Sequence, residues 1–282
     1  MALKIAAMVT LFYPQKENFK NIENYLSEVD RLYVIDNTPN KNNQKELPNH
    51  KKIVYYNFDN IGVAKALNLA ANLALSEKYK WLLTLDQDTE ITKKIVKKLK
   101  ETASKEKTSK IGIITPWHKT KLKIEKPKEK VDYPQDVMTS GNLLNLEIWS
   151  SLNGFQEDFF IDGIDIEYGL RLKKNHYKIM RLNDLEINHD LGDIFYVGNK
   201  LCTNHNGLRR YYMNRNYHYI YENYKNTDYQ FCKFLISNYK TMLKVILFEK
   251  HKFSKIYGFC LGYIHFKKGV KGKLTHFLGK TV

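Results

Sequence analysis

Cysteine is scarce in this sequence, and the three that occur lie far apart, at Cys202, Cys232 and Cys260. An odd number of cysteines with no Cys-x-x-Cys pair argues against a disulfide framework and against the common zinc sites. Unpaired cysteines also fit a reducing compartment. We therefore expect a cytoplasmic protein whose stability comes from a hydrophobic core.

Long apolar runs and complete phosphate-binding loops are missing as well. No uncharged apolar segment approaches the roughly 18–20 residues that span a bilayer. The short apolar run in Met1–Tyr13 is interrupted by Thr10, ends at Pro14 and lacks a cleavage-like site, so it predicts a β-strand rather than a signal peptide. The absence of Gly-x-Gly-x-x-Gly and of a complete P-loop disfavours a dinucleotide oxidoreductase and a P-loop ATPase.

Positive charge is abundant but unevenly placed. The formal net charge is +16 over 282 residues. Residues 206–282 carry 15 Lys/Arg and 3 Asp/Glu, whereas the first 205 residues carry 31 and 27. Hydrophobic residues make up 43% of the chain, enough for a full core. Length and composition predict one large α/β domain followed by a basic appendage.

Strand-like runs alternate with helical patterns along the first half of the chain. The expected strands are Ile5–Phe12, Leu32–Ile35, Ile53–Phe58, Trp81–Leu85 and Ile111–Thr115. The expected helices are Glu17–Val29, Ile61–Leu75 and the segment from Ile91 to Leu99, and Val137–Leu146 is expected to be extended. This alternation predicts a mainly parallel sheet with helices on both faces.

The fourth expected strand ends in two carboxylates, Asp86 and Asp88. Residues i and i+2 of an extended segment point to the same side, so the two side chains can act together. Open α/β sheets bind ligands at the carboxyl ends of their strands, and paired carboxylates are suitable ligands for Mg²⁺ or Mn²⁺. Asp36-Asn37 and Asp59-Asn60 end two other expected strands, which predicts a polar crevice.

A second acidic cluster, Asp162, Asp165 and Glu167, lies at the start of an expected helix. The helix dipole favours negative charge there, but capping explains only one or two acids. One of the three carboxylates is therefore a candidate general base. Gly141 permits either a close backbone approach to a ligand or an ordinary turn, and His189 is either structural or a ligand.

In this order, these segments resemble the family-2 glycosyltransferases of the GT-A fold, and most closely their rhamnosyltransferase-like branch. The resemblance covers about residues 4–220 and rests on Val9–Pro14, Val34–Asn37, Asn60–Ala64, Leu85–Asp88, Ser140-Gly141, Gly154-Phe155, Phe159–Asp162, Asp165–Tyr168, His189–Gly192 and Arg210–Asn216. It implies a Rossmann-like GT-A domain over residues 1–205, with a nucleotide-sugar half at about 1–115 and an acceptor half at about 116–205. A basic, aromatic helical region would follow at 206–282.

The resemblance also implies roles for individual residues. Asp86, Asp88 and His189 would hold Mn²⁺ or Mg²⁺ at the diphosphate of a dTDP- or UDP-sugar. Asp165 would be the general base of an inverting transfer, while Ile164 replaces a glutamate of many relatives and leaves Asp162 as a rival base. The other substrate-binding or bracing positions would be Thr10, Tyr13, Asp36, Asn37, Asn60, Gly62, Asn68, Gly141, Glu167 and Arg171. The first loop, Thr10–Pro14, departs from the commoner Thr-Tyr-Asn-Pro pattern.

The basic tail allows three interpretations. Residues 206–224 combine three arginines with six tyrosines, and Phe231–Phe248 and Ile256–Phe266 mix apolar residues with flanking lysines. Such segments bind nucleic acid, lie on an anionic membrane surface, or pack on the catalytic domain. We favour the membrane, at the inner face of the cell membrane, and expect no nucleic-acid partner; a homodimer stays open.

We therefore expect transfer of a sugar, plausibly L-rhamnose from dTDP-rhamnose, to a surface glycan or lipid-linked acceptor. UDP-hexose and UDP-N-acetylhexosamine donors fit the same scaffold. A nucleotidyltransferase with a two-carboxylate metal site gains no support from the Asp165 region. A non-catalytic membrane or nucleic-acid binding module on a transferase scaffold is the remaining alternative.

Overall fold

The computed structural model describes residues 3–121, 125–188, 194–198, 200–226 and 229–281, except for the side chains of 200, 229–233 and 281. The chain forms two compact units. The first comprises Met1–Phe155 and Tyr168–Asp190, and the second comprises Gln156–Glu167 and Leu191–Val282. The short segment Gln156–Glu167 therefore belongs with the C-terminal helices, although the composition of the chain changes only after residue 205.

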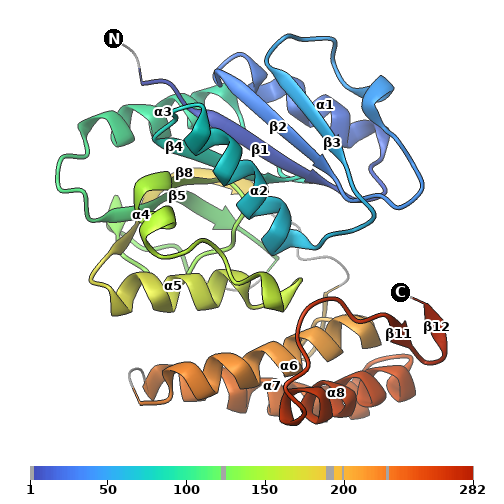
Figure 1. Ribbon diagram of the computed structural model, residues 1–282. Coiled ribbons are helices and arrows are strands. Elements are labelled where there is room, and N and C mark those ends of the chain that lie inside the picture. The colour runs from blue at the N-terminus through green and yellow to red at the C-terminus, as the bar shows by residue number, and fades with distance from the viewer. Residues whose placement is uncertain (1–2, 122–124, 189–193, 199, 227–228, 282) are drawn as a thin grey trace. The chain divides into compact units, whose positions relative to one another are not determined.

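The first unit is built on an eight-stranded sheet with the order β3-β2-β1-β4-β7-β5-β8-β6 (Figure 1). Strands β1 to β4 pair in parallel, as do β5 and β8, while β7 is antiparallel to β4 and β5, and β6 to β8. The strands are β1 Ala6–Leu11, β2 Arg31–Asp36, β3 Ile53–Asn57, β4 Trp81–Asp86, β5 Ile111–Lys119, β6 Val131–Asp132, β7 Asn142–Asn145 and β8 Lys178–Asn188. The predicted, mainly parallel sheet is confirmed.

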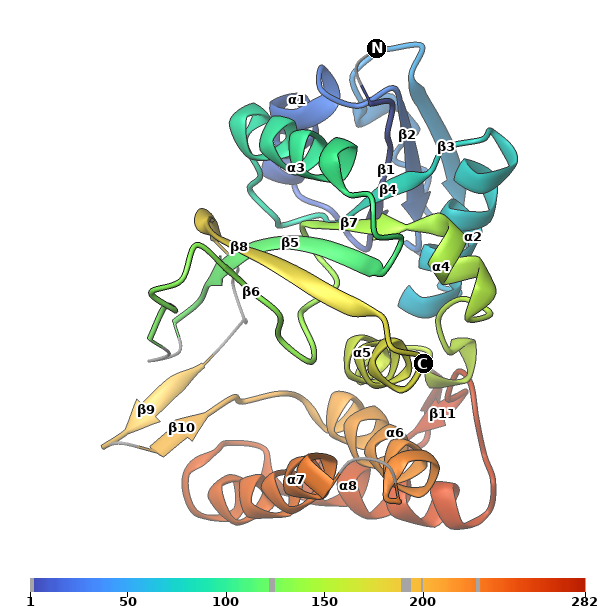
Figure 2. The same cartoon turned by 90° about the vertical axis from the view of Figure 1, so that its left-hand side faces the viewer.

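Helices cover both faces of this sheet. Figure 2 shows α1 and α3 on one side and α2 and α4 on the other. The helices are α1 Lys16–Leu26, α2 Val63–Ser76, α3 Lys93–Lys105, α4 Leu146–Ser151 and α5 Ile164–Lys174, with short 3-10 turns η1 Gln44–Glu46 and η2 Glu157–Phe159. Central strands are buried on both sides, which explains why most of their residues are apolar, as in Trp81–Leu85.

One expectation of extended structure was wrong in part. Within Val137–Leu146, only β7 is a strand, and helix α4 begins at Leu146. The side chain of Asn145 accepts hydrogen bonds from the backbone N–H groups of Glu147 and Ile148, which caps the helix. Because Asn145 caps a helix, the chain changes from strand to helix at this residue, although the sequence before it has a strand-like pattern.

The second unit consists mainly of three helices, α6 Gly207–Tyr224, α7 Tyr229–Phe248 and α8 Lys252–Lys267. Two small hairpins accompany them, formed by β9 Phe195–Val197 with β10 Lys200–Cys202 and by β11 His276–Phe277 with β12 Lys280–Thr281. The predicted basic helical extension is confirmed. Of the helices that the structure describes, none is long and apolar enough to cross a bilayer.

An ionic cluster lies at the centre of the second unit. The carboxylate of Glu249 is fully buried and accepts from Arg210 at 3.2 Å and from Lys255 at 2.9 Å. Both cations are at most 2% exposed, so each charge is paired within the protein. Removing one partner of such a buried group typically costs about 3–5 kcal/mol.

Candidate active site

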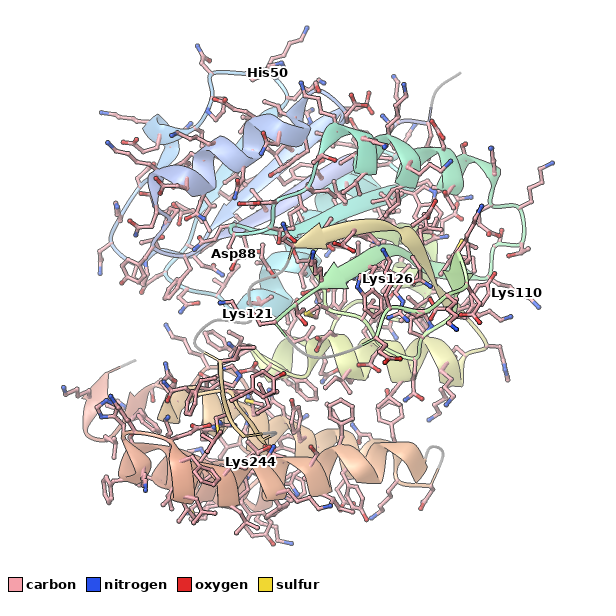
Figure 3. The ribbon with its side chains drawn as sticks, turned by 180° about the vertical axis from the view of Figure 1, so that it is seen from behind. His50, Asp88, Lys110, Lys121, Lys126 and Lys244 are labelled. Carbon is pink, nitrogen blue, oxygen red and sulfur yellow. The ribbon has the colours of Figure 1, made fainter. Side chains whose placement is uncertain are left out.

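The acidic turn at the end of β4 is held by a serine from a distant part of the chain. The backbone N–H of Asp86 donates to Ser140 Oγ at 2.8 Å, and Thr89 Oγ1 lies 2.5 Å from the same oxygen. The N–H of Thr89 also donates to the carbonyl of Asp86 at 3.2 Å. Asp86 is half-buried and Asp88 is exposed (Figure 3), so the turn is rigid but its second carboxylate is accessible.

Gly141, beside this serine, has a positive φ of 78°, and its N–H donates to the carbonyl of Thr84 at 2.7 Å. A Cβ at this position would lie 2.4 Å from Ile187 Cδ1. Packing therefore accounts for the glycine as a turn residue. A close approach to a ligand stays a prediction.

Gln87, between the two aspartates, joins the acidic turn to the first loop. Its Oε1 accepts the N–H of Phe12 at 2.8 Å, and its Nε2 donates to the carbonyl of Phe12 at 3.1 Å. Asn18 Nδ2 donates to the carbonyl of Gln87 at 3.1 Å. The role of Gln87 could not be predicted from the sequence, because its hydrogen-bond partners lie about 70 residues away along the chain.

The first loop also contacts the end of β2. The N–H of Tyr13 donates to Thr38 Oγ1 at 2.9 Å, and the Tyr13 side chain is 54% exposed. Thr10, within β1, is half-buried and pairs in register with Asp86 of β4. The structure therefore brings Thr10, Tyr13 and the acidic turn to the same end of the sheet.

Asp36 is fully buried and its carboxylate is shared among protein donors. One oxygen accepts the N–H of Thr38 at 2.9 Å, and the other accepts Asn43 Nδ2 and the Tyr55 hydroxyl, each at 2.7 Å. Burial raises the pKa of Tyr55, and its hydrogen bond to Asp36 acts in the same direction. Asp36 thus braces the loop after β2, a role that requires no ligand.

Asn37 links this loop to the start of α2. Its Nδ2 donates to the carbonyl of Gly62, and its Oδ1 accepts the N–H of Ile61, both at 3.3 Å. The N–H of Gly62 donates to Asn60 Oδ1 at 3.3 Å, and Gly62 has a positive φ of 86°. The turn therefore needs glycine here, and α2 begins without a side-chain cap.

Asn68 lies deeper in the fold. Its Oδ1 accepts from Trp149 Nε1 at 3.2 Å and from the N–H of Phe155 at 2.7 Å, while its Nδ2 donates to the carbonyl of Phe155 at 2.9 Å. These bonds tie α2 to the segment that follows α4. Asn68 therefore supports the scaffold from within, and contact with a nucleotide stays a prediction.

The second acidic cluster begins in a loop built by α6. Asn216 Nδ2 donates to the carbonyls of Phe159, Ile161 and Asp162 at 3.0, 2.8 and 2.8 Å. Arg215 Nη2 donates to the carbonyls of Asp158 and Phe159 at 3.1 and 3.2 Å. These bonds explain why Gln156–Glu167 belongs to the second unit.

The three acids of this cluster have different surroundings. Asp162 accepts from Arg209 Nε at 3.0 Å, and burial raises the pKa of its carboxyl against the opposing effect of Arg209. Glu167 is buried and accepts the Tyr224 hydroxyl at 2.8 Å. Asp165 is half-buried, and its Oδ1 accepts the N–H of Ile166 at 2.9 Å.

Two predicted positions remain, Arg171 and His189, and the structure describes only the first. Arg171, on the part of α5 that belongs to the first unit, donates to the carbonyl of Leu152 and lies 5.5 Å from the centre of the Tyr168 ring. His189 lies outside the described residues. Within the described ranges, no group of three or more His, Cys, Asp and Glu side chains is arranged to hold a metal ion.

The donor chemistry of the acidic turn fits a hard divalent cation. Asp86 and Asp88 offer carboxylate oxygens, the ligands that Mg²⁺ and Mn²⁺ prefer, and Ser140 holds the backbone N–H of Asp86. Mg²⁺ is commonly bound through one or two carboxylates with substrate phosphates completing its shell. A pair of protein carboxylates is therefore sufficient for that mode of binding.

The sheet order, with its acidic turn at the carboxyl end of β4, defines the GT-A fold of glycosyltransferases. Residues 16–163, more than half of the chain, match glycosyl transferase family 2. The chain belongs to this family, and it is a glycosyltransferase.

Individual relatives agree with this assignment. The chain is 24% identical over 237 residues to the dTDP-rhamnosyl transferase RfbF of Shigella flexneri, covering 77% of this chain and 79% of that protein. A structure of S. aureus TarS 1-349 with UDP-GlcNAc superposes with a TM-score of 0.55 at 14% identity, covering 95% of this chain and 82% of TarS. The structure of GalNAc-T7 with UDP, GalNAc and Mn²⁺ superposes with a TM-score of 0.58 at 13% identity. The match covers 78% of this chain but only 48%, about half, of GalNAc-T7.

Proposed function

We propose that this enzyme transfers L-rhamnose from dTDP-rhamnose to a growing surface glycan, with inversion at the anomeric carbon. The observation that carries the proposal is the braced Asp86-Gln87-Asp88 turn at the carboxyl end of β4. The similarity to a dTDP-rhamnosyl transferase over three quarters of the chain supports the choice of donor.

Asp86 and Asp88, with His189, are the residues that hold a divalent cation in this proposal. When bound, Mn²⁺ or Mg²⁺ supplies positive charge that stabilises the diphosphate leaving group. The Mn²⁺ in the GalNAc-T7 structure supports a metal requirement in this fold. Thr10, Tyr13, Asn37, Asn60 and Gly62 bind the nucleotide, and Asp36 orders the loop that carries Asn37.

Asp165 is the general base. It takes the proton from the acceptor hydroxyl, whose oxygen then forms a bond to the anomeric carbon as the bond from that carbon to the diphosphate oxygen breaks. The nucleoside diphosphate leaves with the bonding electrons, and the sugar configuration inverts. The position of Asp165 in the first turn of α5, after the loop held by Arg215 and Asn216, supports this role, and Asp162 is the rival base.

UDP-hexose or UDP-N-acetylhexosamine is the second candidate donor. The TarS structure with UDP-GlcNAc and the GalNAc-T7 structure with UDP favour it. The two donors differ at the base, where thymine carries a methyl group, and at the ribose 2′-hydroxyl. Competition between dTDP and UDP for one site, measured by calorimetry, separates them: the proposal predicts tighter binding of dTDP, and the reverse order would favour the alternative.

The acceptor in this proposal is lipid-linked, and the enzyme works peripherally at the inner face of the cell membrane. The concentration of lysine and arginine in residues 206–282 supports this location. A basic surface concentrates a protein on anionic lipids. An enzyme held there meets a lipid-linked acceptor more often than one in free solution.

The base assignment is tested by Asp165→Asn. Because a general base typically contributes about 10²–10⁴-fold to a rate, kcat should fall by about 10²-fold or more while the Kd for dTDP-rhamnose stays within about twofold. Asp184→Asn, at an exposed aspartate of β8, is the matched control and should leave both constants unchanged. If Asp165→Asn retains transfer and Asp162→Asn abolishes it, the base is Asp162.

A further inference from the structure

The second unit exposes large apolar side chains on its two C-terminal helices. Leu243 and Leu247 of α7 are 61% and 64% exposed, and Phe253 of α8 is 77% exposed. The outer face, as we call it, is defined by Ile236, Leu243 and Leu247 of α7 and by Phe253, Tyr257 and Ile264 of α8. In each helix, the spacing of these residues places them on one side.

Helix α8 packs on α6 through glycine rather than through its large side chains. A Cβ on Gly258 would lie 2.0 Å from the carbonyl oxygen of Gly207, and one on Gly262 would lie 2.6 Å from that of Tyr211. The two glycines, four residues apart, let the backbones of α6 and α8 approach closely. The apolar side of α8 is therefore left outside the unit.

Helix α7 also carries large apolar side chains on its outer side. Its inner side carries Asn238, Met242 and Val245, all buried, and Asn238 Nδ2 donates to Asn214 Oδ1 of α6 at 2.9 Å. Its outer side carries Leu243 and Leu247. The inner side of α7 is therefore filled by an amide contact and two apolar residues, while Leu243 and Leu247 face solvent on the opposite side.

Helices α7 and α8 are in contact with each other. Tyr239 of α7 and Phe259 of α8 are in edge-to-face ring contact at 5.2 Å. Figure 2 shows the two helices side by side against α6. The outer face thus spans two helices that are in contact, and exposed apolar surfaces mark interaction sites.

The charged residues of α7, α8 and the segment after them are almost all lysines. Residues 229–282 contain eleven lysines and one acid, Glu249, whose carboxylate is buried between Arg210 and Lys255. Lys240 and Lys250 are exposed on the α7 side, and Lys252 and Lys267 on the α8 side. No exposed acid of the described residues 229–281 offsets them.

We infer that the outer face docks on an anionic lipid surface, with its apolar side chains in the headgroup region and its lysines on lipid phosphates. Apolar area together with lysines is the combination that holds helices in the plane of a membrane interface. A second copy fits poorly, since pairing two identical faces would bring lysines against lysines with no acids between them. The inference rests on one part of the proposed function, the location at the membrane, and it names the surface that makes the contact.

The test measures binding of the full chain to phosphatidylcholine vesicles with and without phosphatidylglycerol. The inference predicts sedimentation with the anionic vesicles, weakened by salt, and little with phosphatidylcholine alone. A triple variant combines Leu243→Ser, Leu247→Ser and Phe253→Ser. It should partition into the vesicles about tenfold less or weaker still, because membrane binding scales with buried apolar area. Replacing Lys240, Lys250, Lys252 and Lys267 by glutamine should reduce it similarly.

Matched controls lie on the first unit. Tyr133→Ser changes an apolar side chain that is 54% exposed, and glutamine at Lys93, Lys94, Lys97 and Lys105 removes four exposed lysines from α3. Both controls should bind as the unchanged protein does. Equal binding by the outer-face variants, or no binding of the unchanged protein to anionic vesicles, would overturn the inference.

Two further readouts exclude other occupants and keep the two proposals apart. Light scattering that shows a dimer for the unchanged protein and a monomer for the Leu243, Leu247 and Phe253 variant would assign the face to a second copy and overturn the inference. Calorimetry with dTDP in the absence of vesicles should give the same Kd for both proteins. Vesicle binding without any nucleotide binding would contradict the proposed transferase chemistry and leave the lipid surface standing.

Discussion

At the scale of single residues, Gln87 shows how the acidic turn and the first loop are coupled. Its amide makes two hydrogen bonds to the backbone of Phe12, so the turn and the loop keep a fixed separation. Tyr13, the next residue, has an exposed side chain that our proposal places at the nucleotide. In that proposal, Gln87 is a positioning residue for donor binding.

Gln87→Met tests this coupling, since methionine has a similar length and makes neither bond. We expect the Kd for the donor to rise by about tenfold, corresponding to about 1.4 kcal/mol, as the first loop loses its anchor. Calorimetry with dTDP measures it. Gln44→Met, at an exposed glutamine of η1, is the control, and equal Kd values for both variants would refute the role of Gln87.

His205 gives the second unit a pH-dependent stability. Burial lowers the pKa of His205 to about 3, and the charges of Arg209, Arg210 and Lys255 act in the same direction. In the unfolded chain, the His205 imidazole takes up a proton near pH 6.5, whereas in the folded chain it does so only near pH 3. Stability from neutral His205 is therefore present above about pH 6.5 and falls by about 1.4 kcal/mol per pH unit below it.

His205→Gln should remove this dependence. Between about pH 7 and about pH 5, the unchanged protein should lose roughly 2 kcal/mol of unfolding free energy more than the variant does. Urea unfolding at the two pH values measures the difference. His276→Gln, at an exposed histidine of the same unit, should behave as the unchanged protein, and parallel pH profiles for all three proteins would contradict the account.

At the scale of elements, α6 builds the loop that precedes the proposed base. Arg215 and Asn216 lie on adjacent positions of α6, are fully buried, and hold four carbonyls between Asp158 and Asp162. Hydrogen bonds from one rigid helix fix where α5 begins. Asp165, in the first turn of α5, depends on that start.

Asn216→Ala should disturb this loop by removing the amide that donates to the carbonyls of Phe159, Ile161 and Asp162. We expect a loss of about 2–4 kcal/mol in the stability of the second unit and a lower kcat, with the Kd for dTDP unchanged. Thermal unfolding and transfer assays measure the two effects. Asn223→Ala, at an exposed position of the same helix, should change neither; an unaltered kcat in Asn216→Ala would show that the loop does not position the base.

Local sequence patterns predicted the helices and strands, whereas hydrogen bonds between residues far apart in the sequence could not be predicted. The alternating runs located β1 to β5 and α1 to α3, and the GT-A fold followed from motif order. Sequence alone could not reveal that Ser140 holds the turn at Asp86, or that Gln87 binds Phe12, because these partners are 54 and 75 residues apart. A polar side chain of either type is equally compatible with a solvated loop until its neighbours are known.

At the scale of the whole molecule, the two units supply different parts of the proposed reaction. The first unit carries the acidic turn and the nucleotide positions, and the second carries Asp162, Asp165 and the outer face. Within the second unit, positive charge is concentrated in residues 206–282, which hold 15 Lys/Arg against 3 Asp/Glu. Donor chemistry and membrane contact are therefore separable by mutation.

The most direct test of the central claim is the rate of dTDP release from dTDP-rhamnose by the purified full chain, with a lipid-linked acceptor and Mn²⁺ or Mg²⁺. The account predicts release that stops when EDTA removes the metal and that falls by about 10²-fold or more in Asp88→Asn. Failure to bind or turn over any dTDP- or UDP-sugar, with either metal or without, would contradict it.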